Sequence, residues 1–193
     1  MNKGRLEAFS DGVMAIIITI MVLEIKVPHG EQWATLRPLV SIFLSYILSF
    51  IYVAIYWNNH HHMLHTCKKV TGPILWANLH LLFWLSLIPF STGWMGENHF
   101  AQIPTALYGV VLCCAAFAYW ILKSIIIKSQ GEHSLLKRAV GGDWKGRVSP
   151  AIYLAGILLS AYSQWVSLSL YVLVALLWLI PDRRIERAIE ELN

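Results

Sequence analysis

The sequence predicts an all-α integral membrane protein, with six transmembrane helices in a single unit of 193 residues. Hydrophobic residues make up 57% of the chain and charged residues 13%, whereas soluble domains carry about 25% charged residues. The chain also divides into apolar segments of roughly the 20 residues that a helix needs to cross a bilayer. The basic residues between these segments alternate in a way that fits an even number of crossings.

The apolar segments set the expected helices. We expect spans at residues 6–27, 39–57, 73–92, 103–122, 146–162 and 165–181. The last two divide a long stretch without charge, which at about 1.5 Å per residue is too long for one crossing. Its polar residues Tyr162, Ser163 and Gln164 mark the turn. Residues 58–71 are expected to form a polar loop, and residues 182–193 a charged helical tail.

The lysines and arginines predict the orientation. Six spans place all but two of the fifteen on the side of the termini, and only Lys26 and Arg37 fall on the other side. Because basic residues in short loops favour the cytoplasm, both termini are expected there, in a multi-pass protein of the cell membrane. The net charge of +4 comes from these flanking residues, so no nucleic-acid partner is expected.

Asp11 stands at the start of the first span, where a carboxylate is costly unless a partner satisfies it. On a helical wheel Ile16, Thr19, Ile20 and Leu23 form a stripe within about 60° of Ile16, and Asp11 lies about 140° away. One face can therefore line a cavity while another buries the carboxylate. The plain alternatives are a stripe that faces lipid and an aspartate that stabilises the helix N-terminus at headgroup depth.

The motif Arg5-x-x-x-Phe9-Ser10-Asp11, at the start of the first span, resembles the signature of the transmembrane protein 175 family. These proteins are potassium channels of lysosomes and of many prokaryotes. The resemblance continues through residues 12–16 and Thr19, and the six spans and cytoplasmic termini agree with it. It implies a homotetramer of the prokaryotic single-unit form, with four first helices around a central pore. The loop filter Thr-Val-Gly-Tyr-Gly of other potassium channels does not occur in the chain.

The resemblance also implies roles for the stripe. Ile16, Ile20 and Leu23 would form a hydrophobic filter, with the Thr19 hydroxyl beside it. Apolar rings offer an ion no ligands, so potassium, which holds its water less tightly than sodium, passes more easily, and the rings can close by dewetting. The expected function is passive, moderately selective potassium conduction. No enzymatic activity and no cofactor are expected; the partners are potassium ions, the lipid bilayer and further copies of the chain.

Under the same resemblance Arg5, Phe9, Ser10 and Asp11 become structural residues that hold the first helix in place. The sequence does not choose among the polar partners for Asp11 on the second and third spans. The candidates are Trp57, His60, His61, His62, Asn78 and His80.

The histidines at positions 60 to 65 support a different hypothesis. His61 and His65 stand at i and i+4, a spacing that can hold a metal, which would suit a metal-dependent membrane enzyme. No membrane-embedded carboxylate pair accompanies them. The plain alternative is a helix end held by hydrogen bonds, and a pH-sensing role also fits, because histidine titrates near neutrality. A secondary transporter is a further alternative, although the inverted repeats typical of that class are not found in the sequence.

Overall fold

The computed structural model describes residues 2–131, 136–137 and 143–179, and within these ranges the chain is helical, with no strand. The main elements are α1 (Lys3–Leu23), the 3-10 helix η1 (Trp33–Leu39), α2 (Val40–His65), α3 (Gly72–Ser86), α4 (Ile88–Glu97), α5 (Gln102–Gln130), α7 (Trp144–Leu159) and α8 (Gln164–Leu179). The predicted all-α fold is confirmed. The expected tail at residues 182–193 lies outside the described ranges.

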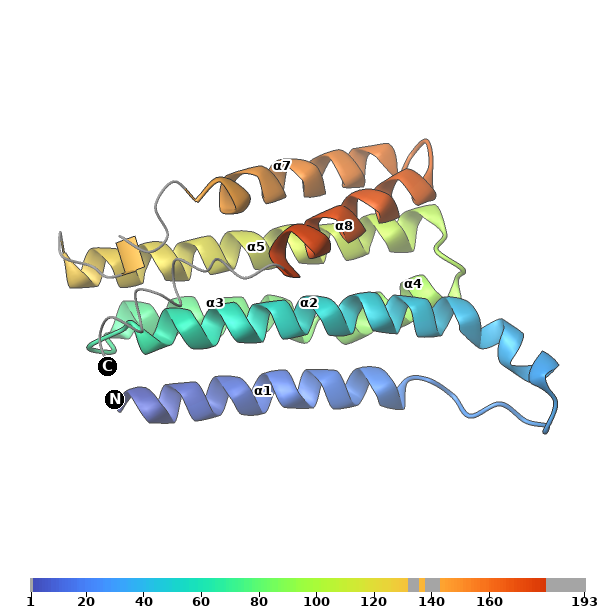
Figure 1. Ribbon diagram of the computed structural model, residues 1–193, viewed down its shortest axis with the longest axis horizontal. Helices are drawn as coiled ribbons and strands as arrows, with labels where there is room; N and C mark the ends of the chain where they lie inside the picture. Colours follow the sequence, from blue (N-terminus) through green and yellow to red (C-terminus); the bar gives the residue numbers. More distant parts are fainter. Residues whose placement is uncertain (1, 132–135, 138–142, 180–193) are drawn as a thin grey trace.

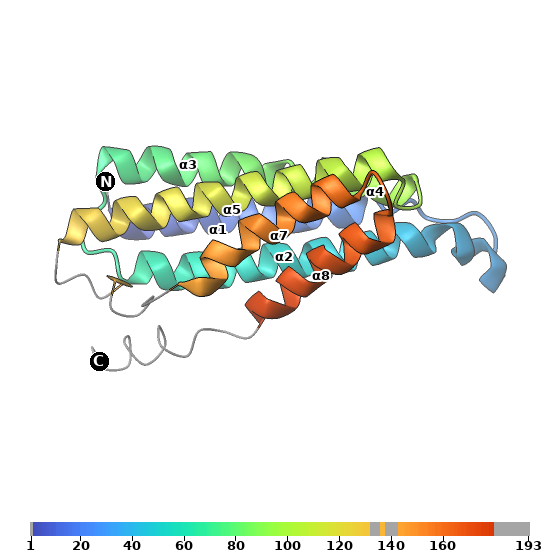
Figure 2. The same cartoon turned by 90° about the horizontal axis from the view of Figure 1, so that it is seen from above.

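The helices form an elongated bundle in which α1 and α7 lie on opposite sides (Figure 1). α1 packs against α2, α3 and α4, whereas α7 packs against α5 and α8. The starts of α1, α3 and α7 lie at the same end as the ends of α2 and α5, in this view and in the perpendicular one (Figure 2). We call this the basic end, after the residues on and between these helix ends: Lys3, Arg5, Lys68, Lys69, Lys123, Lys128, Lys145 and Arg147.

Four helical stretches of the described chain are long and apolar enough to cross a membrane: Lys3–Leu23, Trp33–His65, Gly72–Glu97 and Gln102–Gln130. α8 is a shorter apolar helix. α7 and α8 are joined by a turn at Ser160–Ser163, where Ser163 N–H donates to the Leu159 carbonyl at 2.9 Å. The polar interruption in the last apolar stretch therefore coincides with a reversal of the chain.

α2 and α5 extend furthest beyond their expected ends. α2 continues to His65, so most of the expected polar loop is helical and carries the histidines. Within this extension Asn59 turns its amide back onto the Ile55 carbonyl at 2.8 Å, which satisfies the side chain inside the helix. α5 continues to Gln130 past Lys123, whose ammonium pairs with Asp143 at the start of α7. At both places a polar or charged residue ends the apolar stretch of the sequence, but the helix continues past it.

The third expected span is broken between α3 and α4 at Leu87. Pro89 supplies the cause, because proline has no N–H to donate to the carbonyl of Leu85 and its ring crowds that carbonyl. The chain bends through Leu87, whose N–H donates to Trp84 at 3.2 Å, and resumes with Ser91 N–H donating to Leu87 at 3.1 Å. The two halves together still form one apolar stretch.

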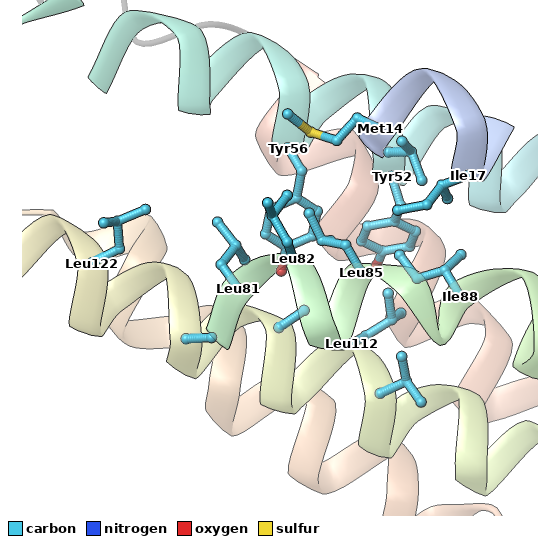
Figure 3. Close-up of a cluster of buried hydrophobic side chains, with 14 of the residues drawn as sticks. Met14, Ile17, Tyr52, Tyr56, Leu81, Leu82, Leu85, Ile88, Leu112 and Leu122 are labelled. Atoms are coloured by element: carbon cyan, nitrogen blue, oxygen red, sulfur yellow. The ribbon is translucent and has the colours of Figure 1, made fainter. Parts of the chain in front are cut away.

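The core lies between α1, α2, α3 and α5 (Figure 3). Met14 and Ile17 of α1 point toward Tyr52 of α2 and toward the leucines of α3. These side chains are almost completely buried: Met14 is 1% exposed, Ile17 3% and Tyr52 2%. One face of α1 is therefore fixed by packing, and this fixes the direction of its opposite face.

Candidate functional site

α1 has two distinct faces. Its buried stripe is formed by Leu6, Ser10, Met14, Ile17 and Met21, spaced three or four residues apart, as expected for one side of a helix.

The other face of α1 carries the expected filter residues. Ile16 is 58% exposed, Ile20 41% and Leu23 79% in the single chain. Thr19 is exposed between them, and its hydroxyl donates to the Ile16 carbonyl at 2.8 Å. The three apolar side chains thus form an uncovered stripe along a helix that is otherwise anchored.

Asp11 is held from α2. The indole N–H of Trp57 donates to Asp11 Oδ1 at 3.0 Å. Asp11 is half-buried and Trp57 is 46% exposed. Since Asp11 lies on the side of α1 away from Ile16, this bond leaves the exposed stripe clear.

A second, buried group of polar side chains joins α1, α2 and α3. Asn78 donates its amide N–H to Ser10 Oγ at 2.9 Å, and its Oδ1 lies 2.6 Å from His60 Nε2. Ser10 in turn donates to the Leu6 carbonyl at 2.9 Å. Ser10 and Asn78 are completely buried and His60 is 1% exposed. Asn78 therefore acts as donor to one helix and acceptor from another, which fixes both its amide orientation and the protonation of His60 Nε2.

The remaining candidate partners lie elsewhere. The ring of His61 stacks on Trp57, with centroids 6.1 Å apart, and the ring of His62 lies 5.7 Å from His61. His80 does not join Asp11: its Nε2 accepts from the indole of Trp84, one turn along α3, at 3.0 Å. Of the six candidates, Trp57 alone is seen to bond to Asp11 among the described residues, and Asn78 links Ser10 to His60. His61 and His62 extend the ring contacts of Trp57, and His80 pairs with Trp84 on α3.

The sequence motif is divided in the same way. Arg5 and Phe9 are exposed, and Phe9 reaches 53%. By helical position both lie on the face of α1 that carries Ile16. Only Ser10 and Asp11 of the motif contact other helices through side-chain hydrogen bonds within the described residues.

An anchor that the sequence analysis missed lies at the start of α1. Lys3 Nζ donates to the His65 carbonyl at the end of α2 at 2.7 Å, and lies 3.8 Å from Glu7. The i, i+4 spacing of Lys3 and Glu7 was the available signal.

The metal hypothesis has little geometric support. His61 and His65 lie one turn apart, with ring centroids 6.3 Å apart. Among the residues that the structure describes, no group of three or more His, Cys, Asp or Glu side chains is placed to hold a metal ion. The ring of His61 stacks on Trp57, and the backbone carbonyl of His65 accepts from Lys3.

The fold and the site define a class: a multi-span helical membrane protein whose first helix is held by polar contacts on one side and exposes an apolar stripe on another. The family model described as "Endosomal/lysosomal potassium channel TMEM175" matches residues 5–89. A potassium channel of Chryseobacterium sp. (strain P1-3) is 59% identical over 191 residues, covering 99% of this chain and 100% of that protein. The chain therefore belongs to the TMEM175 family.

More distant relatives agree with this assignment. A potassium channel of Chamaesiphon minutus is 27% identical over 191 residues, covering 91% of this chain and 92% of that protein. The crystal structure of a lysosomal potassium-selective channel TMEM175 homolog from the same organism superposes with a TM-score of 0.77 at 28% identity, covering 93% of this chain and 97% of that one. Similarity thus extends over nearly the whole bundle.

Proposed function

We propose that this protein is a potassium channel in which α1 lines the conduction path. The channel function rests on the family and on relatives that are potassium channels over nearly the full chain, one of them at 59% identity. The fold agrees with that of a potassium-selective homolog. Neither the metal-dependent enzyme nor the transporter receives support from these relatives.

The observation that carries the role of α1 is the opposition of its two faces. Its polar groups Ser10 and Asp11 bond to α2 and α3, while Ile16, Ile20 and Leu23 remain exposed. An apolar stripe in a single chain can face lipid or a symmetry axis. We assign it to the axis of a homotetramer, because polar anchoring on the opposite side would hold the stripe at a fixed distance from such an axis.

Four copies of this stripe would make three successive apolar rings. A potassium ion crossing them loses part of its water without gaining ligands, and sodium pays a larger dehydration cost. The proposed filter is accordingly moderately selective, and its apolar rings also serve as the gate by dewetting. Conduction is passive and needs no cofactor beyond the permeant ion.

The basic end is proposed to face the cytoplasm of a cell membrane, following the positive-inside rule. The start of α1 and the connections after α2 and α5 lie at this end, whereas Lys26 and Arg37 lie in the connection at the other end. Single cysteines introduced near residues 2 and 31 can be labelled fluorescently in intact cells, which tests this orientation.

The deciding experiment is the reversal potential of purified protein in planar bilayers, with potassium on one side and sodium on the other. We expect a shift toward the potassium equilibrium potential, and crosslinking in the same preparation should give a tetramer. A folded tetramer without current, but with saturable coupled exchange of ions in vesicles, would overturn the channel in favour of a transporter.

A further inference from the structure

A cavity of about 40 Å³ lies between α2, α5, α7 and α8, near the basic end. α5, α7 and α8 lie on the side of the bundle away from α1, and α1 contributes no residue to the cavity (Figure 1). Whatever occupies it is therefore separate from the proposed conduction path.

The walls of the cavity are mainly aromatic. Tyr52 and Tyr56 come from α2, Tyr119 and Trp120 from α5, and Trp178 from α8. The rings of Tyr56 and Tyr119 meet edge to face at 6.1 Å, and those of Tyr119 and Trp178 at 6.4 Å. Such rings offer flat apolar surfaces with polar edges, which suit a ligand that is apolar along most of its length.

Unused polar groups also face this cavity. The Tyr56 side chain is 8% exposed and lines the cavity, and its hydroxyl donates to no acceptor among the described residues, although it is not fully shielded. Asn59 donates to the Ile55 carbonyl, which leaves its Oδ1 as an acceptor. Lys123, buried to 6% exposure, has three donor positions, one of which is directed at Asp143. A hydroxyl and an ammonium that meet the cavity can both donate to an occupant, so Tyr56 and Lys123 favour a guest that supplies acceptor oxygens.

The charge around the cavity selects the sign of such a guest. The Lys123–Asp143 pair is neutral as a whole. The cavity also meets the first turn of α7, through Gly146 and Ser149, but the Asp143 carboxylate accepts from Gly146 N–H there at 3.2 Å and offsets the positive end of that helix. Arg147 is exposed on the same turn. An anionic group beside Arg147 is therefore favoured over a neutral one.

We propose that this cavity binds an anionic phospholipid. The ester end of one acyl chain accepts hydrogen bonds from Tyr56 and Lys123 between the aromatic walls, and the phosphate lies outside beside Arg147. The medium around a membrane-spanning bundle supplies this ligand, and basic pockets between transmembrane helices are recurrent sites for anionic headgroups. The rival occupant is water, because a cavity of this size holds about three molecules.

The test is native mass spectrometry of the full-length protein, released from micelles containing equal amounts of phosphatidylglycerol and phosphatidylcholine. We expect the wild type to retain phosphatidylglycerol in preference. Ala116→Leu places a larger side chain in the cavity wall and should abolish this preference. Tyr56→Phe removes one hydrogen bond and should weaken retention about fivefold. Ala106→Leu, on the same helix but outside the cavity, is the matched control and should behave as wild type.

The outcomes separate a site from lipid that merely surrounds the protein. Equal retention of the two lipids by the wild type overturns the proposal. Undiminished phosphatidylglycerol retention in Tyr56→Phe also overturns it. This variant removes one oxygen and should fold even if Ala116→Leu does not. Either result would indicate that water occupies the cavity. Preferential retention that disappears in Ala116→Leu, weakens in Tyr56→Phe and persists in Ala106→Leu supports the site.

Discussion

The indole of Trp57 donates a 3.0 Å hydrogen bond to Asp11, so an aromatic residue of α2 fixes the carboxylate that lies five residues before the start of the exposed stripe on α1. The acceptor is charged and the donor neutral, a pairing that is stronger than a bond between two neutral groups. Because Trp57 is 46% exposed, water weakens it in the isolated chain. The bond adds to the packing of Met14 and Ile17, which fixes the rotation of α1 about its own axis.

We expect Asp11→Ala to lower the free energy of unfolding of the assembled protein by about 1–2 kcal/mol, because it removes a charge-assisted bond that is partly solvated. Ion preference in the channels that still form should be unchanged. Size-exclusion chromatography and reversal potentials measure the two effects, and a double-mutant cycle with Trp57→Phe isolates the pair. Trp76→Phe, at a side chain 75% exposed, is the control. A stable Asp11→Ala tetramer with altered selectivity would reverse the role assigned to Asp11.

Asn78→Leu should cost more. It leaves Ser10 Oγ and His60 Nε2 without their partner in a buried environment, a loss of about 2–4 kcal/mol. We expect a lower midpoint of thermal unfolding, followed by tryptophan fluorescence, with Leu79→Ala on the exposed side of the same helix as control. Adding Ser10→Ala and His60→Leu should recover part of the loss, since an all-apolar group leaves no polar atom unsatisfied. An unchanged midpoint in Asn78→Leu would contradict this account.

Ile16→Asn should wet the proposed constriction and reduce the preference for potassium over sodium, because amide groups replace part of the lost hydration of either ion. The measurement is the bi-ionic reversal potential, which should move toward zero. Val22→Asn is the matched control: Val22 is 46% exposed on the same helix but lies about 120° from Ile16. If the two variants shift the potential equally, or Ile16→Asn leaves it unchanged, the stripe is not the filter.

Gly109→Ala should disturb the packing of α5 against α8. A methyl group at this position would meet the hydroxyl of Tyr171, which is completely buried. Among the described residues, that hydroxyl is the one side-chain oxygen or nitrogen that is fully shielded from solvent and has no hydrogen-bond partner. Tyr171→Phe alone should therefore cost little. Combined with Gly109→Ala it should restore only part of the lost thermal stability, because the ring carbon Cζ, 2.6 Å from the added methyl group, remains. Failure of this rescue would place the strain at another contact.

Much of the fold could be predicted because hydropathy and basic residues report directly on the membrane. The apolar face of α1 was predictable too, since its stripe follows helical geometry alone. The partners of Asp11 were not: Trp57, His60 and Asn78 all lie on the expected helices, and the choice among them depends on how α1, α2 and α3 are rotated and shifted against one another. That register is set by packing of Met14 and Ile17 in the core, which no local pattern encodes.

Other features of the fold could not be predicted from the sequence, for different reasons. Pro89 was visible but lay inside a continuous apolar stretch, so composition alone did not mark the break between α3 and α4. The cavity beside Lys123 depends on Asp143, twenty residues further on, and on helices that are distant in sequence. A charge that seemed to end a span is instead neutralised by a residue from the next helix, and α5 continues past it.

The hydroxyl proton of Thr19 points back to the Ile16 carbonyl, one turn earlier on α1. What Thr19 presents outward is therefore oxygen lone pairs, without a proton to offer. Around the proposed axis such groups would accept hydrogen bonds but not donate them, and they would repel an anion of any size. The sign of the permeant charge would then be decided by a bond made entirely within one helix, separately from the apolar rings that distinguish potassium from sodium.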